Sequence, residues 1–93
     1  MKLLYGYKDP KNAIECELIE TKYIDGEFIY IARCNETECI QAPVSAFQTF
    51  FRVVILDQDG VTRDNYLYAT TPEDATRRTE TNSNETIFYA EFA

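Results

Sequence analysis

Three cysteine side chains, Cys16, Cys34 and Cys39, could bind a metal or react as thiols. Two thiolates from Cys34 and Cys39, with Cys16 and a carboxylate, would supply the four ligands of a zinc site. The spacing is unusual for zinc, and the chain has no histidine, the commonest neutral metal ligand. An odd number of cysteines without a signal peptide also favours reduced thiols over a disulfide framework. We therefore predict no metal and no other cofactor.

Two carboxylates at the end of the most apolar run form a second candidate site. The segment Arg52–Thr62 reads RVVILDQDGVT. It resembles the first motif of the haloacid dehalogenase-like phosphatases, in which an apolar strand ends in Asp-x-Asp-Gly. The resemblance implies that Asp57 is the nucleophile and Asp59 the acid/base, and that Gly60 and the polar residue after it cradle a phosphate.

The rest of the chain does not supply the remainder of such an enzyme. The phosphatase fold needs parallel strands joined by helices, at roughly 30 residues for each unit, and only 33 residues follow Gly60. No lysine follows Lys22 to neutralise a phosphate, and the absence of histidine excludes Ser-His-Asp and Cys-His sites. Because Asp57–Gly60 is also good turn sequence, we interpret it as a hairpin turn and predict that the protein is not an enzyme.

Acidic residues gather between positions 15 and 38, where only Lys22 and Arg33 oppose them. Such a run is most simply a solvated surface that keeps a small domain soluble. It could also dock a basic partner, with an interleaved tyrosine as an anchor, because tyrosine is enriched at binding hot spots. The candidate partner-binding residues are Glu15, Glu17, Glu20, Asp25, Glu27, Glu36, Glu38 and Tyr30.

The preferred function is a non-enzymatic binding or inhibitor protein that docks the basic surface of a macromolecule. Small acidic single-domain chains of this kind occur among phage and mobile-element proteins that block host defence or nucleic-acid enzymes. One alternative is a module that binds a nucleotide or another metabolite. Another is a structural subunit that assembles with itself through an open sheet edge, so a homo-oligomer is compatible with the sequence.

Composition limits the size and class of the protein. The 93 residues form one domain, too short for a two-domain doubly wound enzyme or an eight-stranded α/β barrel. A net charge of −7 argues against direct binding to nucleic acid. The amino terminus has no signal-peptide pattern, and no segment approaches the run of about 18 apolar residues that a membrane helix needs. We therefore expect a cytoplasmic protein that does not contact membranes.

Alternating apolar residues and turn signals predict a mainly β (α+β) fold, with five or six antiparallel strands in hairpins. One helical turn is expected after Pro43, and a short helix should begin after Thr71, with Pro72 in its first turn. The expected strands span residues 2–8, 13–24, 27–33, 49–56, 61–70 and 86–92, and a short strand over 39–42 is an option.

The dipeptide Asp25-Gly26 predicts a two-residue hairpin turn and so fixes a register. In that register Ile24 faces Glu27, Tyr23 faces Phe28, Thr21 faces Tyr30 and Ile19 faces Ala32. The expected core face carries Ile19, Tyr23, Phe28, Tyr30 and Ala32. Two further consequences are that Cys16 and Cys34 point to opposite faces, and that Glu20 points away from the side shared by Glu15 and Glu17.

Overall fold

The computed structural model describes residues 1–93 as one sheet of seven antiparallel strands with one short α-helix. The mainly β fold in hairpins is confirmed, and the short strand after Glu38 brings the number of strands to seven. The elements are β1 (Lys2–Tyr5), β2 (Ile14–Ile24), β3 (Glu27–Arg33), β4 (Cys39–Pro43), the 3-10 turn η1 (Val44–Ala46), β5 (Phe47–Asp57), β6 (Thr62–Ala69), α1 (Pro72–Arg78) and β7 (Glu85–Phe92).

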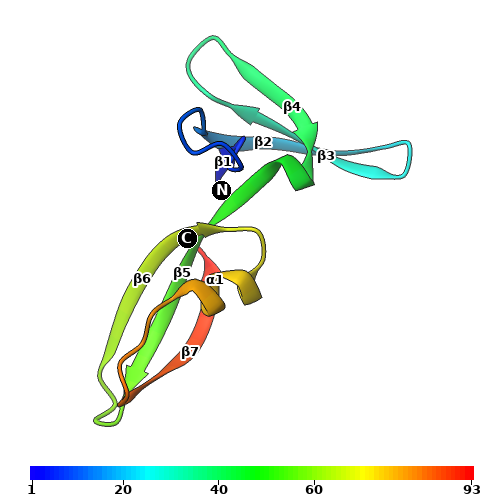
Figure 1. Ribbon diagram of the computed structural model, residues 1–93. Helices are drawn as coiled ribbons and strands as arrows, with labels where there is room; N and C mark the ends of the chain where they lie inside the picture. The colour runs from blue at the N-terminus through cyan, green and yellow to red at the C-terminus, as the bar shows by residue number, and fades with distance from the viewer.

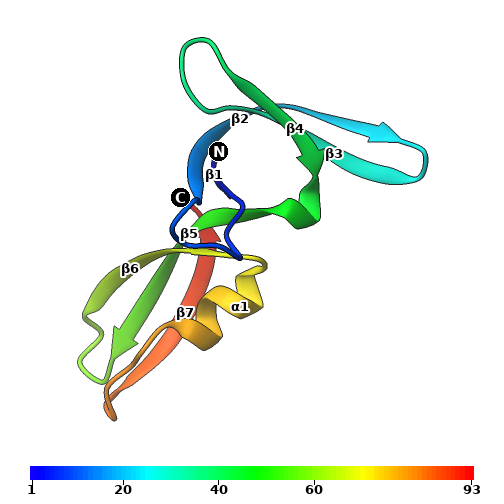
Figure 2. The same cartoon turned by 45° about the horizontal axis from the view of Figure 1, so that its top comes forward.

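The long strand β5 runs through both ends of the molecule. Its first residues pair with β1, and the remainder pairs with β6 along one edge and with β7 along the other. Figures 1 and 2 show β1–β4 grouped at one end, β6, β7 and α1 at the other, and both termini near the middle. The molecule is elongated, with principal extents of 47 × 29 × 21 Å.

Two hydrophobic clusters form along β5, one at each end. In the first, Phe51, Val53 and Ile55 pack with Ala69 of β6 and with Ala75, which α1 contributes. The helix begins as expected, because the Thr71 hydroxyl accepts a hydrogen bond from the Asp74 amide at 3.0 Å. The second cluster contains Leu3, Cys16, Ala32 and Phe47 from four different strands. Each end of the sheet therefore has its own buried core.

The turns form where the sequence predicts them. Asp25 and Gly26 have φ angles of 50° and 80°, as a two-residue hairpin turn with two left-handed positions requires. Gly60 has φ 80° and ends the Asp57–Gly60 turn between β5 and β6. The first strand is shorter than expected, because Gly6 takes φ 69° and turns the chain after Tyr5.

The hairpin β2–β3 departs from its expected register at one residue. Tyr23 faces Phe28 as predicted, and the pairs that Ile24 and Thr21 form are also correct. Ile19 has no partner, however, and Leu18 takes the place opposite Ala32. Ile19 is therefore a β-bulge, and from Leu18 back to the start of β2 every side chain points to the face opposite the one predicted.

The expected core face of the hairpin is correct only near its base. Ala32 is fully buried, but Ile19, Tyr23 and Phe28 are 47%, 65% and 58% exposed. The reason is that β1 pairs only with the first residues of β2, from Ile14 to Glu17. The outer half of the hairpin extends beyond the sheet (Figure 1). Its aromatic side chains therefore remain in solvent.

Replacing Gly26 by valine should destabilise the protein by about 1–3 kcal/mol, because a β-branched residue is strained at positive φ. The nearest atom to an added Cβ lies 4.0 Å away, so the loss comes from the backbone and not from crowding. Urea unfolding measures it, with Gly26→Asn as the control, since asparagine tolerates this conformation better. Equal stability of the valine variant and the parent would contradict the turn geometry.

Candidate functional site

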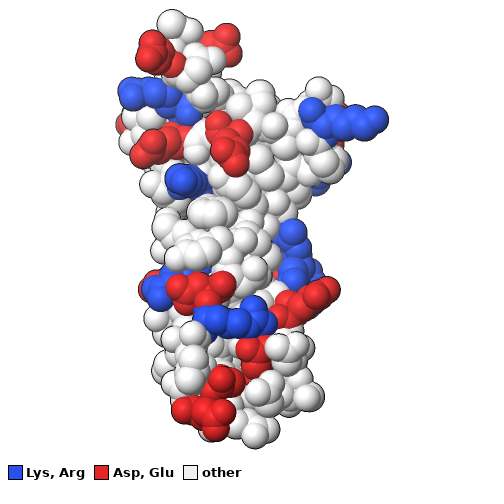
Figure 3. Space-filling view, turned by 90° about the vertical axis from the view of Figure 1, so that its left-hand side faces the viewer, with Lys and Arg blue, Asp and Glu red and all other residues white.

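Five ion pairs lie in the carboxy-terminal half of the chain. Arg52 contacts Asp64 and Glu91, Arg63 contacts Glu85, and Arg77 and Arg78 both contact Asp74. These contacts neutralise most of the carboxylates that surround α1, β6 and β7. In Figure 3 the middle of the molecule correspondingly shows blue and red groups side by side.

The acidic residues between Glu15 and Glu38 form none of these ion pairs, and every one of them is exposed. Asp25 and Glu27 lie at the tip of the β2–β3 hairpin, and Glu36 and Glu38 lie in the loop before β4. That loop forms the top of the view in Figure 3, where carboxylates are visible. This segment therefore presents negative charge that no arginine or lysine in the chain pairs at close range.

The bulge gathers three of these carboxylates on one face. Glu17 lies opposite Arg33, and Glu20 lies opposite Ile31. Because Ile19 is an extra residue between them, Glu20 points to the same side as Glu17 and Glu15, so the expectation that Glu20 points away is wrong. We call Glu15, Glu17 and Glu20 the β2 carboxylates.

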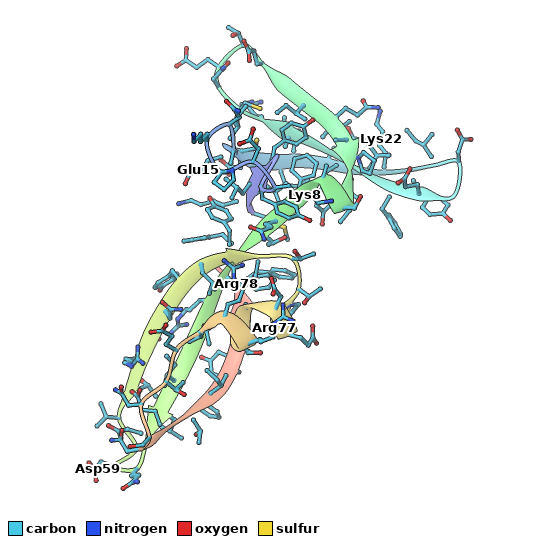
Figure 4. The ribbon with its side chains drawn as sticks, in the orientation of Figure 1. Lys8, Glu15, Lys22, Asp59, Arg77 and Arg78 are labelled. Atoms are coloured by element: carbon cyan, nitrogen blue, oxygen red, sulfur yellow. The ribbon has the colours of Figure 1, made fainter.

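The β2 carboxylates lie near two cations and one tyrosine. Lys2 of β1 and Arg33 of β3 flank Glu17 on its two neighbouring strands, without a salt bridge. Burial and the nearby Glu15 carboxylate raise the pKa of the Tyr68 phenol on β6. The charge of Glu15 therefore acts across the sheet toward β6 (Figure 4).

Tyr30, the predicted aromatic anchor, packs inward instead. Its ring lies 5.6 Å from the ring of Phe47, against the cluster that contains Ala32. The aromatic pair that this hairpin exposes is Tyr23 and Phe28 at its tip, with ring centroids 4.9 Å apart. The pattern of the hairpin alone assigned this pair to the core. The short amino-terminal strand is the feature that leaves it uncovered.

The Asp57–Gly60 segment serves the hairpin turn. One carboxylate oxygen of Asp57 accepts hydrogen bonds from the amides of Asp59 and Val61 at 2.8 and 2.9 Å. The next strand, β6, runs antiparallel to β5. The resemblance to phosphatases implies a parallel sheet, which this chain does not form, so Asp57 has a structural role as the cap of the turn.

The cysteines are arranged differently from the prediction. The sulfur atoms of Cys16 and Cys34 lie 3.5 Å apart, so the expectation that they point to opposite faces is wrong. The bulge at Ile19 is the cause, because it moves Cys16 by one position relative to β3. Burial, followed by the contact with Cys34, raises the pKa of the Cys16 thiol to about 12. Cys39 is exposed, and no group of three or more potential ligands could hold a metal ion.

The surface also contains shallow hollows. One of about 370 Å³ lies beside Gly6 and is lined by Tyr5, Tyr7, Lys8 and Ser45. A second, of about 220 Å³, lies beside Cys16 and Cys34 and is lined by Lys2, Arg33 and Tyr68 among others. Of the two, only the second adjoins the β2 carboxylates.

Comparisons with protein-family models, with curated proteins and with solved structures found no match to this chain. None of its helices has the length and apolar character needed to cross a membrane. The geometry of the exposed groups is therefore the guide to function.

Removing the Asp57 carboxylate should destabilise the β5–β6 hairpin by about 0.5–2 kcal/mol, since two backbone amides would lose their acceptor. Asp57→Ala should show this loss in urea unfolding. Asp57→Asn should lose much less, because an amide oxygen can still accept both hydrogen bonds. Equal losses in the two variants would contradict the capping role.

Acid should destabilise the protein partly through Glu85. Hydrogen bonds from Arg63, and from the Asn82 amide, lower the pKa of this carboxyl from 4.5 to about 2. A lowered folded-state pKa stabilises the protein above the ordinary pKa, and this contribution disappears as pH falls from about 4.5 towards 2. Glu85→Gln should therefore flatten the dependence of unfolding free energy on pH in that range. Glu80→Gln, which removes no ion pair, should leave the slope unchanged, and a parental slope in Glu85→Gln would contradict the assignment.

Proposed function

We propose that this protein is a non-enzymatic binding protein that docks a basic surface of a macromolecular partner through the β2–β3 hairpin. The observation that supports this most is the contrast in charge pairing between the two ends of the molecule. Carboxylates near α1, β6 and β7 contact arginine, whereas those from Glu15 to Glu38 are exposed and form no salt bridge. Unpaired carboxylates attract a basic partner without first breaking an internal contact.

The hairpin combines two kinds of binding group. The β2 carboxylates supply long-range attraction, which mainly raises the rate of association. Tyr23 and Phe28 supply an exposed aromatic pair at the tip, where burial against a partner would slow dissociation. A hairpin that extends beyond its own sheet can enter a groove that a flat surface could not reach.

The partner that fits these groups is a protein with a lysine- and arginine-rich groove. Such grooves occur in proteins that contact nucleic-acid phosphates, so occupation by an acidic hairpin would inhibit a nucleic-acid or defence enzyme. A phage or mobile-element origin agrees with that role. We propose the cytoplasm as the compartment, since the three thiols are free.

Reversing the β2 carboxylates to lysine (Glu15→Lys, Glu17→Lys and Glu20→Lys together) should slow association with the captured partner about tenfold or more. The partner is first captured from cell lysate at low salt and identified by mass spectrometry, and its association rate is then measured by surface plasmon resonance. For the parent, this rate should fall steeply between about 0.01 and 1 M salt, as the screening length shrinks from about 30 to 3 Å.

The matched control reverses three exposed acids elsewhere, Asp59, Glu73 and Glu80, and so changes the net charge by the same amount. Asp59 lies at the far tip of the β5–β6 hairpin, well separated from Glu15 at the base of β2 (Figure 4). The control triple should retain most of the association rate. An equal loss in both triples, or a rate independent of salt, would remove the electrostatic role of the β2 carboxylates.

Substituting Tyr23 and Phe28 by alanine should raise the dissociation rate of the same complex while changing the free energy of unfolding little, because both rings are largely exposed. Phe88→Ala, which removes an aromatic ring 61% exposed on β7, is the control and should leave dissociation unchanged. Unchanged dissociation of the hairpin double variant would show that the tip does not enter the interface.

A further inference from the structure

Cys16 and Cys34 occupy a cross-strand position that brings two thiols into direct contact. In the ladder of β2 and β3, Glu17 faces Arg33, so the next position toward the start of β2 sets Cys16 opposite Cys34. Their sulfur atoms lie 3.5 Å apart, although the residues are separated by 18 positions in the chain. A disulfide joins sulfurs about 2 Å apart, so a small side-chain rotation would suffice.

The two thiols also differ in access. Cys16 is buried, with 6% of its surface exposed, whereas Cys34 is half-buried beside the hollow that Lys2, Arg33 and Tyr68 line. Both thiols adjoin this hollow, but a small molecule reaches the more exposed Cys34 first, and the buried Cys16 is placed to react with the sulfur of Cys34. This is the arrangement of an attacking and a resolving thiol.

We propose that Cys16 and Cys34 form a reversible intramolecular disulfide by exchange with a low-molecular-weight disulfide such as glutathione disulfide. The Cys34 thiolate attacks one sulfur of glutathione disulfide, forms a mixed disulfide and releases one glutathione. The Cys16 thiolate then attacks the Cys34 sulfur and releases the second glutathione. The two protein thiols lose two electrons and two protons in total, and the glutathione disulfide gains them. Because burial raises the pKa of the Cys16 thiol, the thiolate that the second step needs becomes more abundant as pH rises, and the second step accelerates with it.

The disulfide would fix the register of the hairpin. In a ladder without the bulge, Cys16 and Cys34 would point to opposite faces and could not bond. The same bulge places Glu20 on the face of Glu15 and Glu17. Oxidation therefore holds the β2 carboxylates in the arrangement that the proposed function uses, although disulfide formation itself does not depend on that function.

The test uses the purified full chain and glutathione disulfide as the probe. After incubation, acid quenching and alkylation, Cys16 and Cys34 should both resist alkylation while carrying no glutathione, whereas the exposed Cys39 either stays free or carries one glutathione. Peptide mass spectrometry should show Cys16 joined to Cys34, and the oxidised protein should melt at a higher temperature than the reduced protein, reversibly with dithiothreitol.

Matched serine variants separate this pairing from other thiol chemistry. Cys39→Ser should oxidise like the parent. Cys16→Ser should stop at a mixed disulfide on Cys34, and Cys34→Ser should form no intramolecular bond. A Cys34–Cys39 bond, a glutathione that persists on Cys34 in the parent, or only disulfide-linked dimers would overturn the proposal. The disulfide test does not involve the basic partner, so failure of the disulfide leaves the docking proposal standing.

Discussion

One unpaired residue, Ile19, determines which side chains of β2 lie together. The Asp25-Gly26 turn sets the register of the outer hairpin, and the extra residue shifts the base of β2 by one position relative to β3. As a result Cys16 joins the buried cluster opposite Cys34, while Glu15, Glu17 and Glu20 share the other face. Both proposals for this chain depend on that shift. The bulge at Ile19 thus decides which side chains meet on the neighbouring strand, including the contact of Cys16 with Cys34.

The second constraint is the length of β5, which gives each end of the sheet its own core. Phe47 packs at the amino-terminal end and Phe51 at the other, four residues along the same strand. The two ends then use charge differently. Around α1, β6 and β7, arginines pair with carboxylates and so connect neighbouring elements of the fold. At the β1–β4 end the carboxylates form no salt bridge within the chain.

Local chemistry explains which parts of the fold the sequence predicts. Turns depend on a few adjacent residues, so Asp25-Gly26, Asp57–Gly60 and the Thr71-Pro72 helix start were all identified correctly. The bulge has no local signature, because Ile19 is a common strand residue. The exposure of Tyr23 and Phe28 depends on where β1 ends. These features arise from tertiary pairing, which alternation of apolar residues does not specify.

The register at the base of the hairpin can be tested by nuclear Overhauser effects between backbone protons across β2 and β3. The bulged ladder predicts cross-strand effects joining Leu18 to Ala32 and Glu17 to Arg33, together with those joining Tyr23 to Phe28 near the turn. Effects joining Ile19 to Ala32 in place of Leu18 to Ala32 would show an unbroken ladder. In an unbroken ladder Glu20 would point away from Glu15 and Glu17, and Cys16 would point away from Cys34. That result would contradict the bulged register.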